Sequence, residues 1–431
     1  NSAAVKKGGT GYYSVNVDVK NWNVLTSSGD VYGYRQILNP VYPHAMISQP
    51  DFTMAPNKAL LTSAELTGTS PQVVTYKIRP EAVWSDGTPI SAADFEYTWK
   101  VQDPAQCAKC QASNPSGYSL IESVTGSDNG KTVAVKFKSP FSPWKLLFPY
   151  LLPAHIAKAD SDMAKGFNET FASTVPTWSG GPFVIDKYVP NQSITFKPNP
   201  KWYGDKPNLD TFVVRIITDE RQAVTAMANN EIQVLAPTPT LDLVTQLKNN
   251  TNLTVDTATG LLYEHVDFRT QHPSLADVNL RKAIFTAIST QAIIDKTVGQ
   301  YAPGVKPLGN RNFMPGQTLD GVPAYVDTTT PLGLGTGNVE AAKKILTDAG
   351  YKLEGEKLID PKGTAVPPLR IVYTKNNQTR KDTSVLLQNT LKPLGVQLVL
   401  TETDGLGKTI TSGDFDLVIY GTNIDTIPTT T

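Results

Sequence analysis

The sequence predicts a mixed α/β protein that contains at least two packed units. Its 431 residues exceed the size at which a single hydrophobic core stops growing. Hydrophobic residues make up 40% of the chain and charged residues 18%, which is the usage of an ordinary globular protein. Short strand-like runs and helix-like segments alternate from one end to the other. Together these observations define the fold class.

The expected strands are short runs rich in Val, Ile, Tyr and Phe. They cover residues 73–79, 132–138, 193–199, 210–217, 367–373 and 396–402. Helical spacing of apolar residues predicts helices over 91–102, 219–230, 279–289, 338–350 and 380–395. The first of these helices begins at Ser91 as N-cap, with Asp94 completing a capping box. Gly350 and Gly395 are expected to end two others.

The 32 prolines and 31 glycines are spread along the chain, so composition alone marks no domain boundary. The longest proline- and glycine-rich segment, residues 301–337, is unusual for a connection inside a compact domain. Segments of this length usually serve a function or form a lid. We therefore expect a functional loop there.

Charge and hydropathy restrict the partners of the protein. Lys plus Arg and Asp plus Glu number 39 each, which argues against nucleic acid or an anionic membrane surface as a partner. No run of about 18 apolar residues exists, so no membrane span is expected. The polar start lacks the apolar stretch of a signal peptide, which fits a cytosolic protein or an exported protein without its leader.

The two cysteines, Cys107 and Cys110, have the spacing C-A-K-C in a polar loop. A zinc site would need two more ligands, and the four histidines are scattered along the chain. A thioredoxin-like redox pair would require a strand-to-helix turn, which this loop does not resemble. We therefore favour a disulfide that clamps the loop, and such a bond would imply an oxidising compartment.

Catalytic motifs are absent or incomplete. The segment DGLGKT lacks a phosphate-binding loop's first glycine, because Glu402 stands in that place. No G-x-S-x-G or H-E-x-x-H motif occurs. His265 lies in the segment LLYEHVDF, whose residues alternate as in a β-strand. At such a position a packed or hydrogen-bonded imidazole is commoner than a catalytic base. A hydrolase that uses His265, or Glu402 with Asp404, remains the weaker alternative, and we predict a protein that is not an enzyme.

Four stretches in order resemble the extracellular solute-binding proteins of family 5, which serve peptide, nickel and oligosaccharide ABC importers. The first stretch, residues 76–100, has a strand, the turn Asp86-Gly87-Thr88 and a capped helix. The second stretch covers residues 180–217, and the third, 265–289, carries the R-x-A-I helix pattern. The fourth runs from 341 to 421. The resemblance therefore spans nearly the whole chain.

The resemblance implies a periplasmic-binding-protein-like fold of type II, in which two lobes surround a ligand cleft and a subdomain is inserted into the first lobe. Residues 1–35 and 177–262 would form lobe I, 36–176 the inserted subdomain and 263–431 lobe II. Family members continue beyond the point where this sequence stops and return to lobe I. Ligand would be held by hinge closure.

The resemblance also suggests ligand-binding residues. In peptide binders of the family an Asp after the F-D-L strand pairs with the ligand's α-ammonium group, and the matching position here is Asp425, close to Asn423. The motif departs from the family at Thr422 and at 426–428, so a solvated turn aspartate is the alternative. Further candidates lie where the lobes meet, and each could instead pack in a core: Asn21, Trp22, Trp178, Tyr263 and His265.

As a function, the resemblance implies a receptor of an ABC importer that captures a small ligand, above all short peptides, and delivers it to the permease subunits. No cofactor and no metal are expected, and the protein is expected to be a monomer. It would lie in the periplasm or outside the cytoplasmic membrane, held by a lipid on an N-terminal cysteine that this sequence does not contain. The alternatives are a sugar or nickel-chelate binder, or a binding-protein fold recruited to a cell-envelope task such as glycolipid synthesis.

Overall fold

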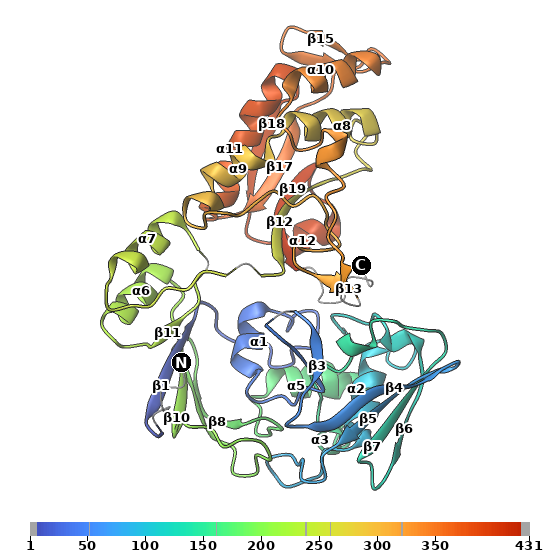
Figure 1. The fold of residues 1–431 in the computed structure, drawn as a ribbon, viewed down its shortest axis with the longest axis vertical. Helices are drawn as coiled ribbons and strands as arrows, with labels where there is room; N and C mark the ends of the chain where they lie inside the picture. The colour runs from blue at the N-terminus through green and yellow to red at the C-terminus, as the bar shows by residue number, and fades with distance from the viewer. Residues whose placement is uncertain are drawn as a thin grey trace. The chain divides into compact units, whose positions relative to one another are not determined.

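The structure is a computed structural model that describes residues 7–50, 52–160, 162–237, 239–258, 260–319 and 322–423. The chain divides into two compact units. Unit 1 extends to residue 238, and unit 2 begins at Pro239. Both units combine helices and sheets, which confirms the α/β class (Figure 1).

The first sheet of unit 1 has the strand order β11-β1-β10-β9-β8. Strand β1 pairs in parallel with β10 and β11, whereas β9 is antiparallel to both β10 and β8. The N-terminal strand is therefore built into a sheet whose other strands come from after residue 180. The bounds are β1 Thr10–Val15, β8 Phe183–Val189, β9 Ser193–Pro198, β10 Thr211–Ile216 and β11 Val234–Leu235, with helices α1 Tyr32–Leu38 and α6 Glu220–Ala228.

The second large sheet of unit 1 is antiparallel, with the order β4-β5-β7-β6. Helix α2, Ala92–Gln102, packs against it through Phe95 and Trp99, which are both buried. Its strands are β4 Leu61–Thr69, β5 Gln72–Ile78, β6 Ile121–Ser127 and β7 Thr132–Phe137. Smaller elements are β2 Met46–Ser48, β3 Met54–Pro56, η1 Tyr118–Leu120, η2 Trp144–Leu146, α3 Ala154–Ala157, α4 Met163–Lys165, the π-helical turn η3 Gly166–Thr170 and α5 Phe171–Ser173.

The start of α2 follows the sequence prediction. The Ser91 hydroxyl accepts a hydrogen bond from the Ala93 amide at 3.3 Å, and the Asp94 carboxylate accepts one from the Ser91 amide at 2.8 Å. Asp94 also accepts from the amide of Ala154 at 2.9 Å. Because Asp94 is only 2% exposed, burial raises the pKa of its carboxyl. The capping box therefore also ties α2 to α3.

Unit 2 is built on a sheet of order β12-β19-β17-β18. Val266 and Phe268 of β12 share a core with Leu417 and Ile419 of β19 and with residues of α8, α10 and α11. The bounds are β12 Leu262–Phe268, β17 Leu369–Thr374, β18 Leu398–Thr403, β19 Leu417–Asn423, α8 Val278–Ala287, α10 Val339–Asp348 and α11 Gln378–Leu391. The remaining elements are α7 Leu241–Asn249, α9 Thr290–Lys296, η4 Val298–Gln300, β13 Thr318–Leu319, β14 Val322–Pro323, η5 Thr330–Leu332, β15 Lys352–Glu354, β16 Lys357–Ile359, η6 Lys392–Leu394 and α12 Leu406–Ser412.

The long segment 301–337 is held by hydrogen bonds within itself. The Gly309 amide donates to the Tyr325 hydroxyl at 2.8 Å. Asp327 accepts from the amides of Thr329 and Thr330, each at 2.9 Å. The hydrogen bond from the Thr330 side chain, and then those from the two amides, lower the pKa of the Asp327 carboxyl to about 2. The described part of this segment is thus an ordered loop, and its role as a lid stays a prediction.

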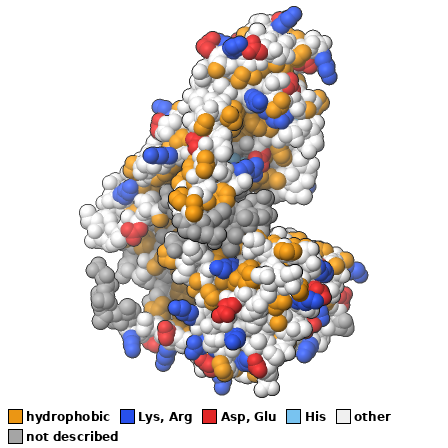
Figure 2. Space-filling model, turned by 45° about the vertical axis from the view of Figure 1, so that its right-hand side comes forward, with side chains coloured by type: hydrophobic (Ala, Val, Ile, Leu, Met, Phe, Trp, Pro, Cys, Tyr) orange, Lys and Arg blue, Asp and Glu red, His pale blue; other side chains and the backbone are white. Residues whose placement is uncertain are grey.

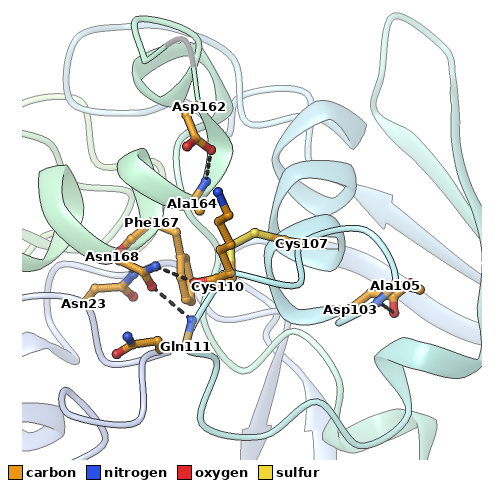
Figure 3. Close-up of a disulfide and its surroundings, with 11 residues drawn as sticks. Asn23, Asp103, Ala105, Cys107, Cys110, Gln111, Asp162, Ala164, Phe167 and Asn168 are labelled. Carbon is orange, nitrogen blue, oxygen red and sulfur yellow. Dashed lines mark hydrogen bonds between the residues drawn. A yellow bond between two sulfur atoms is a disulfide. The ribbon is translucent and has the colours of Figure 1, made fainter.

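The disulfide predicted between Cys107 and Cys110 is present (Figure 3). Asn168 binds the residues on either side of Cys110. Its side chain accepts a hydrogen bond from the Gln111 amide at 3.0 Å and donates one to the Lys109 carbonyl at 2.8 Å. The neighbouring Phe167 carbonyl accepts from the side chain of Asn23 at 2.8 Å. The bridge therefore fixes a loop that contacts the segment following β1.

Charges of both signs are interspersed on the molecular face drawn in Figure 2, in keeping with the equal numbers of basic and acidic residues. Within the described ranges, no helix combines the length and the apolar character that a membrane crossing requires.

Candidate functional site

A cluster of polar and aromatic side chains lies on the sheet of unit 2, on the face opposite its core. Because successive residues of a strand point to opposite faces, Tyr263, His265 and Asp267 lie on one face, while Val266 and Phe268 point into the core. Tyr420 stands opposite His265 on the neighbouring strand. These four residues form what we call the β12–β19 cluster.

Hydrogen bonds order this cluster around Asp267. His265 Nδ1 lies 3.0 Å from Asp267 Oδ1, and the Tyr420 hydroxyl donates to Asp267 Oδ2 at 2.7 Å. The His265 ring contacts that of Tyr420 edge to face at 4.2 Å between centroids, and its centroid lies 5.1 Å from that of Tyr263. The carboxylate thus holds both a ring nitrogen and a phenol in fixed positions.

The electrostatics of the cluster favour an ionised Asp267. The hydrogen bond from His265 and then that from Tyr420 lower the pKa of Asp267, although burial opposes them. Burial, followed by the bond to Asp267, raises the pKa of Tyr420 to about 12. An ionised carboxylate only accepts hydrogen bonds, so His265 Nδ1 carries the proton. His265 Nε2 is buried and has no hydrogen-bond partner among the residues that the structure describes.

Strand β12 also lies at an edge of its sheet. The Arg269 amide bonds to the Asp416 carbonyl at 2.9 Å, which continues the antiparallel register. Hydrogen-bonded pairs alternate along such a ladder, so the main-chain groups of Glu264, Val266 and Phe268 point away from β19. Within the described residues no strand pairs with β12 on that side. The edge therefore offers main-chain donors and acceptors beside the cluster.

In unit 1, the predicted site residues Asn21 and Trp22 are buried in the segment after β1. The Asn21 amide group donates to the hydroxyls of Thr26 and Ser28 at 2.9 and 2.8 Å, which fixes the turn. Trp22 is 4% exposed and meets Tyr188 of β8 edge to face at 5.0 Å. Both side chains support the fold here, and contact with ligand stays a prediction for them.

Trp178 lies in the core of unit 1. Its ring meets those of Tyr42, Trp84 and Phe171 edge to face, with centroid distances of 4.9, 5.7 and 5.8 Å. Only 7% of the residue is exposed. These surroundings agree with the alternative expected from the sequence, that Trp178 packs in a core. Contact between Trp178 and a ligand stays a prediction.

The remaining predicted residues lie at the end of β19. Asn423 is its last residue and pairs in register with Leu262 of β12. Asp425 lies outside the described residues, so its assignment as an ammonium partner stays a prediction.

The carboxylates proposed for a hydrolase have structural partners. Glu402 accepts a hydrogen bond from the Tyr373 hydroxyl at 3.3 Å, and Asp404 lies 3.5 Å from Lys375 Nζ. The described residues contain no group of three or more His, Cys, Asp or Glu side chains that could hold a metal ion.

Two residues of the β12–β19 cluster, Asp267 and Tyr420, were not among the candidates indicated by the sequence. Asp267 carried a usable signal, since it continues the alternation of Tyr263 and His265 in one strand. Tyr420 carried none, because only the register between β12 and β19 brings it opposite His265, 155 residues away in the chain. Long-range pairing of this kind cannot be obtained from a single sequence.

The fold of the described residues is that of a periplasmic binding protein. More specifically, the family model described as bacterial extracellular solute-binding proteins, family 5 Middle, matches residues 55–431, and the chain belongs to this family. Its members are the substrate-binding proteins of ABC transporters and are not enzymes. Both the family resemblance and the non-enzymatic class predicted from the sequence are confirmed.

Relatives share much of the chain length. The oligopeptide-binding protein OppA of Mycobacterium tuberculosis is 30% identical over 436 residues, which cover 99% of this chain and 70% of that protein. The probable monoacyl phosphatidylinositol tetramannoside-binding protein LpqW of the same organism is 28% identical over 305 residues, covering 70% of this chain and 45% of LpqW.

Solved structures confirm the fold. The periplasmic EDTA-binding protein EppA superposes with a TM-score of 0.94 at 38% identity, over 99% of this chain and 80% of EppA. AppA from Bacillus subtilis, in complex with a nonapeptide, gives a TM-score of 0.78 at 20% identity, over 98% and 80% of the two chains. The predicted binding-protein architecture of type II is therefore correct.

Proposed function

We propose that the protein is an extracellular receptor that captures a short peptide and delivers it to the permease of an ABC importer. One observation carries the choice of a peptide: the free edge of β12 lies directly beside the β12–β19 cluster. An extended peptide can add to such an edge as a further strand through main-chain hydrogen bonds. Similarity to OppA supports the same ligand class.

The cluster would supply the contacts that the edge lacks. Main-chain pairing with Glu264, Val266 and Phe268 is independent of peptide sequence. Tyr263 and Tyr420 would offer flat apolar walls, and His265 Nε2 would give one directed polar contact. A receptor built in this way tolerates varied side chains and still fixes the direction of the peptide.

The domain and site assignments made from the sequence belong to this proposal. Lobe I would comprise residues 1–35 and 177–262, with 36–176 inserted, and 263–431 would form lobe II. Asp425 would pair with the peptide's α-ammonium group beside Asn423. Asn21, Trp22 and Trp178 would lie near the ligand on the other lobe. Closure of the two lobes would then sequester the peptide.

The cellular setting follows from the family. We propose an exported protein at the outer face of the cytoplasmic membrane or in the periplasm, held by a lipid, which acts as a monomer and docks on the permease subunits. The disulfide between Cys107 and Cys110 supports an oxidising compartment.

A metal chelate is the second candidate ligand. The similarity to EppA, at 38% identity and a TM-score of 0.94, favours it specifically. A chelator brings most of the metal's ligands with it, so the lack of a three-residue metal group among the described residues would not prevent binding. Similarity to LpqW supports a role in the cell envelope as a further alternative.

Native mass spectrometry of freshly purified protein tests the proposal first, because it identifies any ligand that copurifies. Calorimetric titration with a tripeptide library and with Fe(III)-EDTA then compares the two classes. We expect peptide binding that weakens about tenfold or more in Asp267→Asn, since a charge-assisted hydrogen bond in the cluster is lost. Asp414→Asn, exposed on the same unit, is the control. Binding of Fe(III)-EDTA with no response to any peptide would replace the peptide proposal with the chelate.

A further inference from the structure

The long loop 301–337 brings an exposed arginine to the β12–β19 cluster. Arg311 is exposed, and its positive charge is close enough to act on both the Asp267 carboxylate and the Tyr420 hydroxyl. These two groups are bonded to each other at 2.7 Å. Figure 1 shows the loop, in orange, beside strands β12 and β19. The loop therefore supplies a cation to a cluster whose own members include no Lys or Arg.

Hydrogen bonds within the loop hold the main chain on both sides of Arg311. The side-chain oxygen of Asn310 accepts from the amides of Asn312 at 2.8 Å and Phe313 at 3.2 Å. The side-chain nitrogen of Asn310 donates to the Val326 carbonyl at 3.1 Å. The position of the Arg311 main chain is thus set before any ligand arrives, which lowers the entropy that binding would cost.

The guanidinium of Arg311 is not committed to the fold. No hydrogen bond or ion pair links it to another residue that the structure describes, although Asp267 is near, because the Asp267 oxygens are bonded to His265 and Tyr420. The other arginines of unit 2 each bond to a carbonyl or a carboxylate, and they are Arg269, Arg281, Arg370 and Arg380. Among these arginines Arg311 alone keeps its donors for a ligand.

The chemistry of this position favours a carboxylate. A guanidinium presents a planar fork of donors that matches a carboxylate through two parallel hydrogen bonds. His265 Nε2, on the same face of the sheet, is buried without a partner in the described part of the chain and can accept one N–H. The last residue of a peptide carries both groups, an N–H and a carboxylate.

We propose that Arg311 binds a carboxylate of the ligand beside Asp267 and Tyr420, at the exposed face of the β12–β19 cluster. This inference rests on the proposed receptor function and deepens it, because it names the ligand group that this face selects. The carboxylate can be the carboxyl end of a peptide or an arm of a metal chelate. In either case a neutral amide in its place binds more weakly, since a charge-assisted hydrogen bond is lost.

Nuclear magnetic resonance of the full chain with N-acetylglycine tests the assignment without relying on a natural ligand. We expect saturable changes in the Arg311 Nε–H signal and in the Asn312 amide signal, and no saturable change with N-acetylglycinamide. Affinity measured at the Asn312 amide should fall about tenfold in Arg311→Gln and less in Arg311→Lys, which keeps the charge without the fork. Equal responses to the two compounds, or no change in either signal, would overturn the assignment.

Lys282→Gln is the matched control for the loss of one positive charge. Lys282 is exposed on α8, and α8 packs on the core side of the sheet, opposite the β12–β19 cluster. This variant should bind N-acetylglycine like the unaltered protein. An equal loss of affinity in Lys282→Gln and Arg311→Gln would show a general charge effect and contradict a site at Arg311.

Calorimetry then identifies the source of the carboxylate. A tripeptide with a free carboxyl end should bind about tenfold more tightly than its amide, and Arg311→Gln should remove this difference. If Fe(III)-EDTA binds in place of peptides and weakens in Arg311→Gln, the peptide proposal fails while the Arg311 assignment stands. If peptides bind and neither amidation nor Arg311→Gln changes their affinity, the assignment fails alone. If neither class binds, the receptor proposal fails and the N-acetylglycine result decides on Arg311.

Discussion

Trp178→Ala should destabilise unit 1 strongly, because the structure places this candidate ligand residue in a core. Replacement of a buried Trp by Ala typically costs about 3–5 kcal/mol, and each of the three edge-to-face ring contacts contributes about 0.5–1.5 kcal/mol beyond burial. For a unit of this size, each 1 kcal/mol lowers the melting temperature by about 2–4 °C. The expected loss is therefore about 6–20 °C.

Tryptophan fluorescence during heating measures this effect on unit 1 alone. All six tryptophans of the chain lie before residue 239, so unit 2 does not contribute to the signal. Trp178→Phe should lose less, since a smaller ring still contacts Tyr42 and Phe171. Trp202→Ala is the matched control, because Trp202 is partly exposed, its indole donates to the nearby Asp205 carbonyl, and its ring contacts that of the adjacent Tyr203.

A loss below about 1 kcal/mol in Trp178→Ala would refute the core assignment, since that value is far under the range for a buried Trp. Weaker ligand binding without loss of stability would show that Trp178 serves the ligand directly. Loss of stability with unchanged ligand affinity in Trp178→Phe would assign the residue to packing.

Three further predictions concern other parts of the chain. Ser179→Ala should cost about 1–3 kcal/mol in urea unfolding, because the buried hydroxyl lies 2.6 Å from the Phe183 carbonyl and accepts from the Gly181 amide at 3.0 Å. The lowered pKa of Asp267 contributes stability above about pH 4 that is lost as the pH falls through the folded-state pKa, so calorimetric melting of Asp267→Asn should depend less on pH in this range. Replacing Cys107 and Cys110 by Ser should cost about 2 kcal/mol, as expected for so short a closed loop, and an unchanged melting curve would contradict this.

The local elements could be predicted because their signals lie within a few residues of each other. Ser91 and Asp94 form the predicted capping box, and Gly350 and Gly395 adopt the positive φ angles of 87° and 73° that suit glycine after a helix. The disulfide could likewise be predicted from the short spacing between Cys107 and Cys110. The pairing of β1 with β10 could not be predicted from composition or periodicity, because about 200 residues separate the two strands.

The candidate site was predictable only in part for the same reason. His265 was expected to be hydrogen-bonded, and the structure supplies Asp267 two positions along the strand as its partner. Tyr420 and Arg311 gave no local signal, since the first depends on strand register and the second on where the long loop folds beside the sheet. A sequence pattern marks which residues are polar, but not which of them end up without a partner.

The core of unit 1 bears on how a ligand would be enclosed. Strand β1 is paired with β10, and residues of both large sheets of the unit belong to one hydrophobic cluster, including Val15 and Val214 from the first sheet and Tyr76 and Val135 from the second. Ser179 adds a polar connection, since its carbonyl accepts from Ser85 and its hydroxyl bonds at the start of β8. A close-packed core resists internal sliding, so residues 36–176, which we propose to be an inserted subdomain, are expected to move together with the first sheet. The closure that we propose would then change the chain between the two units and leave each unit intact.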